Sequence, residues 1–83
     1  MMITIDCTGV ENARQMHELL ARELSFPPYY GHNLDALFDC LTEMGNRTIR
    51  LEGYMALGEW KDRFTGVFAN VALENPDLDI VLI

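Results

Sequence analysis

The stretch that decides the fold is Leu78–Ile83, which reads Leu-Asp-Ile-Val-Leu-Ile. A nearly continuous apolar run of this length is typical of a strand that is covered on both faces, as in parallel sheets. Two more stretches, Met2–Asp6 and Thr48–Glu52, have the β-branched composition of short strands. Their separations of 25 residues or more exclude hairpins. We therefore expect three parallel strands joined by right-handed crossovers.

The first connection has the periodicity of two helices. Between residues 11 and 24, apolar side chains recur at spacings of three and four, with charged residues between them. His17 is predicted to lie on the solvent side of this helix. A second helix is predicted from Leu34 to Met44, because Asn33 is a good N-cap and a Gly-Asn pair follows the apolar period.

The sequence of the second connection predicts a short helix over residues 56–64, a break at Thr65 or Gly66, and a further helix that ends near Glu74. The turn-forming residues 75–77 follow it. The chain has 83 residues, which is the size of one small domain. The sequence therefore predicts the α/β class, as a small three-layer domain over residues 1–83 with a three-stranded parallel sheet and about four helices.

The composition restricts the kinds of partner. Six basic residues against 13 acidic ones give a net charge of −7, which argues against nucleic acid because phosphates would be repelled. No run reaches the ~18 apolar residues of a membrane span, and the first residues do not resemble a signal peptide. Cys7 and Cys40 are too few for a secreted disulfide scaffold. We expect reduced thiols, a cytoplasmic location and no contact with membranes.

The negative charge is concentrated in one part of the chain. No Lys or Arg occurs between Arg22 and Arg47, and this stretch contains Glu23, Asp35, Asp39 and Glu43. On a helix, Asp35 and Asp39 share one stripe with Glu43 beside it, whereas Leu34, Leu37 and Leu41 form the core face. Like charges four residues apart destabilise a helix slightly. The stripe is either a solvated surface or a binding surface for a basic partner.

The segment before this helix favours binding. Tyr29, Tyr30, Gly31 and His32 lead directly into the acidic helix. Aromatic rings with polar tips and a glycine that permits close approach are typical of interaction hot spots. Either tyrosine could instead be a core ring with its hydroxyl at the surface.

A catalytic interpretation uses His32 with Asp35 and Asp39 as an acid–base or metal site. The spacing fits no zinc or calcium pattern, and no phosphate loop or activated nucleophile accompanies it. The sequence therefore favours a protein that is not an enzyme and that needs no metal or cofactor. A small hydrolase remains an alternative.

The stretch Tyr29–Thr42, which reads Tyr-Tyr-Gly-His-Asn-Leu-Asp-Ala-Leu-Phe-Asp-Cys-Leu-Thr, closely resembles the motif of the barstar-like family of intracellular ribonuclease inhibitors. The resemblance implies a three-stranded parallel sheet and a protein that, as a monomer, plugs the active site of a secreted ribonuclease at one-to-one stoichiometry. It implies that Asp39 is the principal phosphate mimic, that Asp35 is a second acid, and that Tyr29 packs on a catalytic histidine.

The rest of the expected partner-binding surface surrounds these three residues. It consists of Tyr30, Gly31, Asn33, Leu34, Ala36, Phe38, Thr42 and Glu43, and at its edge of His32, Met44 and Asn70. Four of these positions depart from the family pattern, which has tryptophan at Phe38 and Met44, an acid at His32 and a glutamate at Asn70. The alternative function is a regulatory or immunity module of the same fold that binds another basic protein or a non-nuclease toxin.

Overall fold

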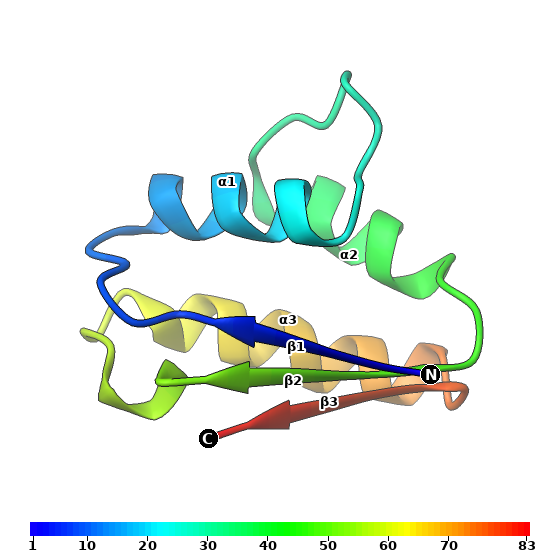
Figure 1. Cartoon of the computed structure of the whole chain (residues 1–83). Coiled ribbons are helices and arrows are strands. Elements are labelled where there is room, and N and C mark those ends of the chain that lie inside the picture. The colour runs from blue at the N-terminus through cyan, green and yellow to red at the C-terminus, as the bar shows by residue number, and fades with distance from the viewer.

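The structure is a computed structural model that describes residues 1–83 (Figure 1). The elements, in chain order, are β1 (Met2–Asp6), α1 (Ala13–Glu23), α2 (Leu34–Thr42), β2 (Arg47–Glu52), the 3-10 turn η1 (Tyr54–Ala56), α3 (Lys61–Glu74) and β3 (Leu78–Leu82). The three strands are parallel in the order β1-β2-β3. The predicted α/β class and the parallel three-stranded sheet are confirmed.

The helix count differs from the prediction by one. The two helices expected here are one helix in the structure: residues 57–60 form a loop after η1, and α3 runs from Lys61 to Glu74 without the expected break at Thr65 or Gly66. The chain enters η1 through Gly53 in the left-handed region, with φ of 76°, and leaves it through Leu57 in an extended conformation. The extended residue and the following Gly58 interrupt helical geometry, although Leu57 and Trp60 still pack against the core as partly buried side chains.

The layering also differs from the expected three layers, because only one face of the sheet is covered. Ile5 and Leu51 are paired in register and fully buried. On the opposite face, Thr4 and Asp79 are exposed, and Val81 keeps 40% of its surface exposed. Right-handed crossovers that advance along the sheet in one direction place the helices on a single face, which gives two layers. Val81 is an apolar residue on the uncovered face of the sheet. It makes the sequence of β3 resemble that of a strand buried on both faces.

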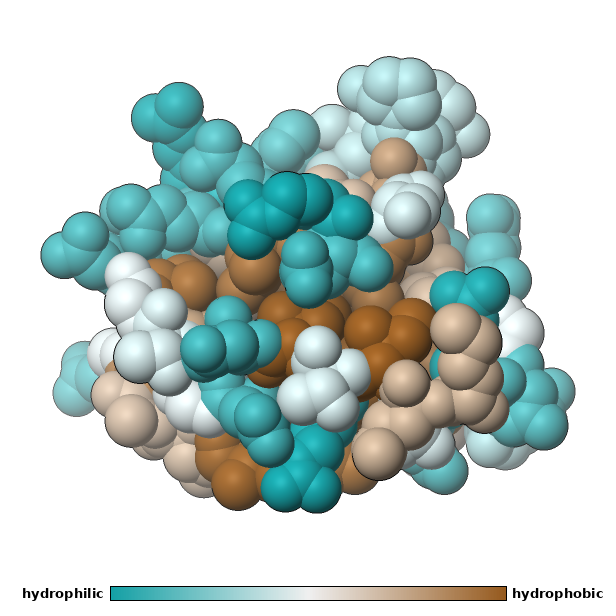
Figure 2. Space-filling model, in the orientation of Figure 1, coloured by the Kyte–Doolittle hydropathy of each residue, from teal (hydrophilic) through white to brown (hydrophobic).

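Polar and apolar side chains are interspersed over the sheet, in the lower half of the view of Figure 2. On this open face, Arg50 pairs with Glu52 at 3.1 Å between Nε and Oε2. The open face is therefore a mixed surface. No helix combines the length and the apolar character needed to cross a lipid bilayer, since even α3 has only 14 residues.

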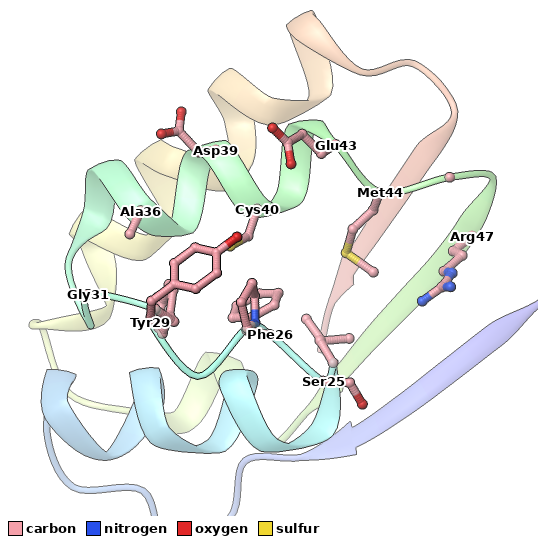
Figure 3. Close-up of a pocket in the computed structure, with 14 residues that line it drawn as sticks. Ser25, Phe26, Tyr29, Gly31, Ala36, Asp39, Cys40, Glu43, Met44 and Arg47 are labelled. Atoms are coloured by element: carbon pink, nitrogen blue, oxygen red, sulfur yellow. The ribbon is translucent and has the colours of Figure 1, made fainter.

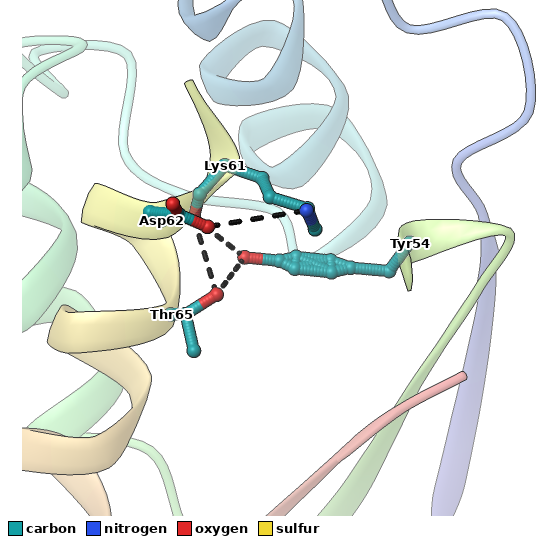
Figure 4. Close-up of polar contacts among 4 residues, drawn as sticks. All are labelled: Tyr54, Lys61, Asp62 and Thr65. Carbon is teal, nitrogen blue, oxygen red and sulfur yellow. Dashed lines mark hydrogen bonds and ion pairs between the residues drawn. The ribbon is translucent and has the colours of Figure 1, made fainter. Parts of the chain in front are cut away.

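The core lies between the sheet and the helices, and a buried phenol ties η1 to α3 (Figure 4). Tyr54 is fully buried, and its hydroxyl donates to the carbonyl of Lys61 at 2.9 Å. The same hydroxyl lies 2.8 Å from Oγ1 of Thr65. Burial raises the pKa of Tyr54, so the group remains a neutral hydrogen-bond donor. These bonds fix the start of α3, which packs along α2.

Candidate functional site

The start of α2 is held by a capping arrangement that confirms the predicted N-cap. Asn33 has extended backbone angles, and its Oδ1 accepts a hydrogen bond from the amide of Ala36 at 2.8 Å. Its Nδ2 donates to the carbonyl of Gly31 at 3.3 Å. A Cβ added at Gly31 would lie 2.8 Å from that Nδ2, closer than packed atoms tolerate. A side chain at residue 31 would therefore displace the amide of Asn33 from its hydrogen bond to the carbonyl of Gly31.

The acidic stripe of α2 faces solvent without compensation from the chain itself. Asp35, Asp39 and Glu43 are all exposed, and none of them forms an ion pair. The three ion pairs of the molecule lie elsewhere, in Arg22–Glu23, Arg50–Glu52 and Lys61–Asp62. The last turn of α2 carries no basic residue. The negative charge of this helix is therefore free to act on another molecule.

The two tyrosines of the loop have opposite environments. Tyr29 is 86% exposed, whereas Tyr30 is only 6% exposed and belongs to the core. The hydroxyl of Tyr30 lies 2.6 Å from Nδ1 of His17. Burial raises the pKa of the Tyr30 phenol. Tyr29 alone offers its ring to a partner, and Tyr30 anchors the loop beneath it.

His17 is the clearest failure of the sequence interpretation. It was expected at the surface, but only 5% of it is exposed. Its ring packs 4.9 Å from the ring of Phe64, between centroids, and its Nδ1 contacts Tyr30. Burial, together with nearby His32, lowers the pKa of His17. A buried, neutral histidine therefore supports the loop from inside.

His32 leads the chain into α2 in an unusual backbone conformation. Its φ is 52°, a conformation that non-glycine residues rarely adopt. Its Nδ1 lies 3.0 Å from the carbonyl oxygen of Tyr30. No group of three His, Cys, Asp or Glu side chains in the molecule is arranged to hold a metal ion. The hydrolase alternative therefore gains no geometric support from this residue.

The remaining predicted residues border the same surface with different exposure. Phe38 and Met44 are partly buried against the core. Asn70 is exposed on α3, the helix that packs against α2. The other half-buried positions are Leu34, Ala36 and Thr42. The structure thus places the loop next to α2, and α2 next to α3, the helix that carries Asn70.

Two features of the site could not be found by sequence reasoning. Asn75, expected only as a turn residue, is buried and donates from Nδ2 to the carbonyls of Leu41 at 3.1 Å and Met44 at 3.0 Å. A hollow of about 480 Å³ also opens between the loop and α2 (Figure 3). Cys40 lines it as a free thiol, and burial together with Glu43 and Asp39 raises the pKa of that thiol. Neither feature has a local sequence signal, because both depend on distant segments meeting.

The buried His17 predicts a loss of stability on acidification. Its folded pKa lies below the ordinary value of 6.5, so the unfolded chain takes up the proton first as the pH falls. The contribution of His17 to stability is complete above pH 6.5 and declines below it, until the folded form is also protonated. Denaturant unfolding between pH 7.5 and pH 5 measures this slope. We expect His17→Gln to flatten it and His32→Gln to leave most of it, because burial is the larger cause. Equal slopes in wild type and His17→Gln would contradict this assignment.

The fold and the site define a class, namely small α/β proteins that expose an unpaired acidic helix and an aromatic ring next to each other. Residues 1–70 match the family model described as "Barstar (barnase inhibitor)", so the chain belongs to the barstar family. A relative from Bacillus subtilis (strain 168), named "Putative ribonuclease inhibitor YrdF", is 40% identical over 72 residues, which cover 87% of this chain and 77% of the relative. The resemblance seen in the Tyr29–Thr42 motif is confirmed.

Proposed function

We propose that this protein inhibits a basic, secreted-type microbial ribonuclease by inserting α2 and the preceding loop into the active site of the enzyme. The observation that carries the proposal is the exposure of Asp35 and Asp39, one turn apart and without an ion pair, on a helix that is capped and packed against the core. A ribonuclease site is cationic because it must hold RNA phosphates. Two carboxylates on a rigid helix can occupy those cationic positions.

The chemistry of this phosphate mimicry explains why a ribonuclease bound to this protein would be inhibited. A carboxylate offers the negative charge of a phosphate but contains no phosphodiester bond to cleave. Tyr29 adds an exposed ring that can pack on a flat group of the enzyme, such as a catalytic histidine. Because α2 is held by Asn33 and by core packing, little conformational freedom would be lost on binding.

The protein acts, in this proposal, as a non-enzymatic monomer that binds one ribonuclease molecule inside the cell that makes the enzyme. The membership in a family described as barnase inhibitors supports the inhibitory role. The free thiols of Cys7 and Cys40 are consistent with a reducing compartment. The pKa of Cys7 is raised to about 11 by burial and by neighbouring Asp6, so this thiol is inert at neutral pH.

Inhibition of a ribonuclease panel tests the proposal. The panel contains barnase, basic secreted ribonucleases of the same class and any ribonuclease encoded beside this protein. We expect one-to-one inhibition of at least one of them, with an association rate that falls as salt is raised, because opposite charges steer the encounter. Absence of inhibition at micromolar concentration would overturn the proposal. Capture of a basic non-nuclease protein from the native cells would then favour the regulatory-module alternative.

A further inference from the structure

The hollow beside α2 carries opposite charges at separate places along its rim (Figure 3). Its floor is apolar, formed by Phe26, Cys40 and Met44, which pack against the core as partly buried side chains. Glu43 borders it as the C-cap of α2, and Arg47 borders it where β2 begins, at the end remote from Tyr29. The hollow is therefore continuous with the acidic stripe at one end and is bordered by the positively charged Arg47 at the other.

Neither rim charge is neutralised within the chain. Glu43 and Arg47 form no ion pair, with each other or with another residue. Arg47 is half-buried, and its backbone amide donates to the carbonyl of Asp77 at 3.2 Å, while its side chain lines the hollow. Of the six basic residues of the chain, Arg47 alone lines this hollow. A partner that covers the hollow must therefore contact both the negative charge of Glu43 and the positive charge of Arg47.

The positive charge of Arg47 has the opposite sign to the acidic residues on the rest of this surface. The proposed partner is cationic where it meets Asp39, and a cationic surface that continued to Arg47 would place like charges together, which weakens binding. A partner with a carboxylate at that end would instead gain an ion pair, and arginine suits a carboxylate because its planar fork can donate two parallel bonds.

We propose that Glu43 and Arg47 form a charge-reading subsite that selects, among basic ribonucleases, those that place a basic side chain against Glu43 and an acidic side chain against Arg47. This inference rests on the proposed function and narrows its partner. It assigns to the far half of the hollow a role in specificity, whereas the stripe around Asp39 supplies the general attraction to a cationic site.

A charge exchange tests the subsite at constant net charge. The probes are the ribonucleases of the panel that the wild-type protein inhibits, and the measurement is the inhibition constant at low salt and at 0.3 M salt. Arg47→Glu should weaken binding of the selected enzyme at least tenfold more than Arg14→Glu, the same charge reversal at an exposed arginine of α1 that forms no ion pair. The double variant Glu43→Arg with Arg47→Glu should weaken it about 100-fold although the net charge is unchanged.

The outcomes separate the subsite from the proposed function. If Arg47→Glu binds more tightly, or if it and the double variant behave like Arg14→Glu, the subsite is refuted even though inhibition stands. If the wild-type protein inhibits no ribonuclease, the proposed function falls and the subsite falls with it. Thermal unfolding of each variant checks the fold, and Arg47→Gln, which removes the charge without reversing it, should show an intermediate loss with wild-type stability.

Discussion

Asp39→Ala should abolish most of the inhibition while leaving the fold intact. Truncating one member of a buried, hydrogen-bonded charge pair costs about 2–5 kcal/mol, a range to which the barnase–barstar complex itself contributes and which is an expectation for this relative. The affinity should therefore fall between about 30-fold and about 4,000-fold. The cost arises because cations of the enzyme would be left buried without their partner.

The stability of Asp39→Ala should be unchanged or slightly raised. Asp35 and Asp39 are like charges four residues apart, and alanine is the best helix former, so the substitution relieves a repulsion and improves α2. Titration of ribonuclease activity gives the affinity, and denaturant unfolding gives the stability. Glu59→Ala is the control, since Glu59 is equally exposed but lies outside the site. An equal loss of inhibition in both variants would show that net charge, and not the α2 stripe, controls binding.

Asn75→Ala should have the largest effect on stability among the polar substitutions. Its Nδ2 satisfies the carbonyls of Leu41 and Met44, which lie in and just beyond the last turn of α2. The carbonyl of Leu41 also accepts from the amide of Met44 at 3.3 Å, so the carbonyl of Met44 is the acceptor that loses its partner. An unsatisfied buried acceptor costs about 1–3 kcal/mol, and the free energy of unfolding should fall by about this amount. For a domain with a typical stability of about 5–15 kcal/mol, this is a substantial fraction.

Asn70→Ala provides the matched control for this prediction. Asn70 is the same residue type on α3 but is exposed and makes no side-chain hydrogen bond, so its removal should change the free energy of unfolding by less than about 0.5 kcal/mol. Hydrogen exchange should also show weaker protection at the C-terminal end of α2 in Asn75→Ala alone. Similar behaviour of the two variants would mean that Asn75 does not support the helix that carries the acids.

The features that were predictable from the sequence are those encoded by local pattern. The strands at Met2–Asp6 and Leu78–Leu82 are continuous β-forming runs, and the start of α2 follows from Asn33 as a cap. The exposure of Asp35 and Asp39 followed from helical phase, because Leu37 and Leu41 occupy the core face of the same helix.

The features that escaped prediction depend on contacts between distant segments. His17 has no feature that distinguishes a surface histidine from a buried one until Tyr30 and Phe64 are placed against it. The number of layers depends on the common direction of the two crossovers along the sheet. The apolar Val81 led to the wrong prediction, because it suggested that both faces of β3 are covered. The predicted helix start at residue 56 is wrong because Leu57 and Trp60 keep apolar spacing through a segment that is not helical.

The sheet face that the helices leave uncovered has a practical consequence. It lies on the far side of the sheet from the helical layer, and it includes the exposed side chain of Thr4 in the middle of the edge strand β1. A fluorophore or surface tether attached there would point away from the acidic helix. The protein could thus be immobilised with α2 and the loop before it still accessible to solution.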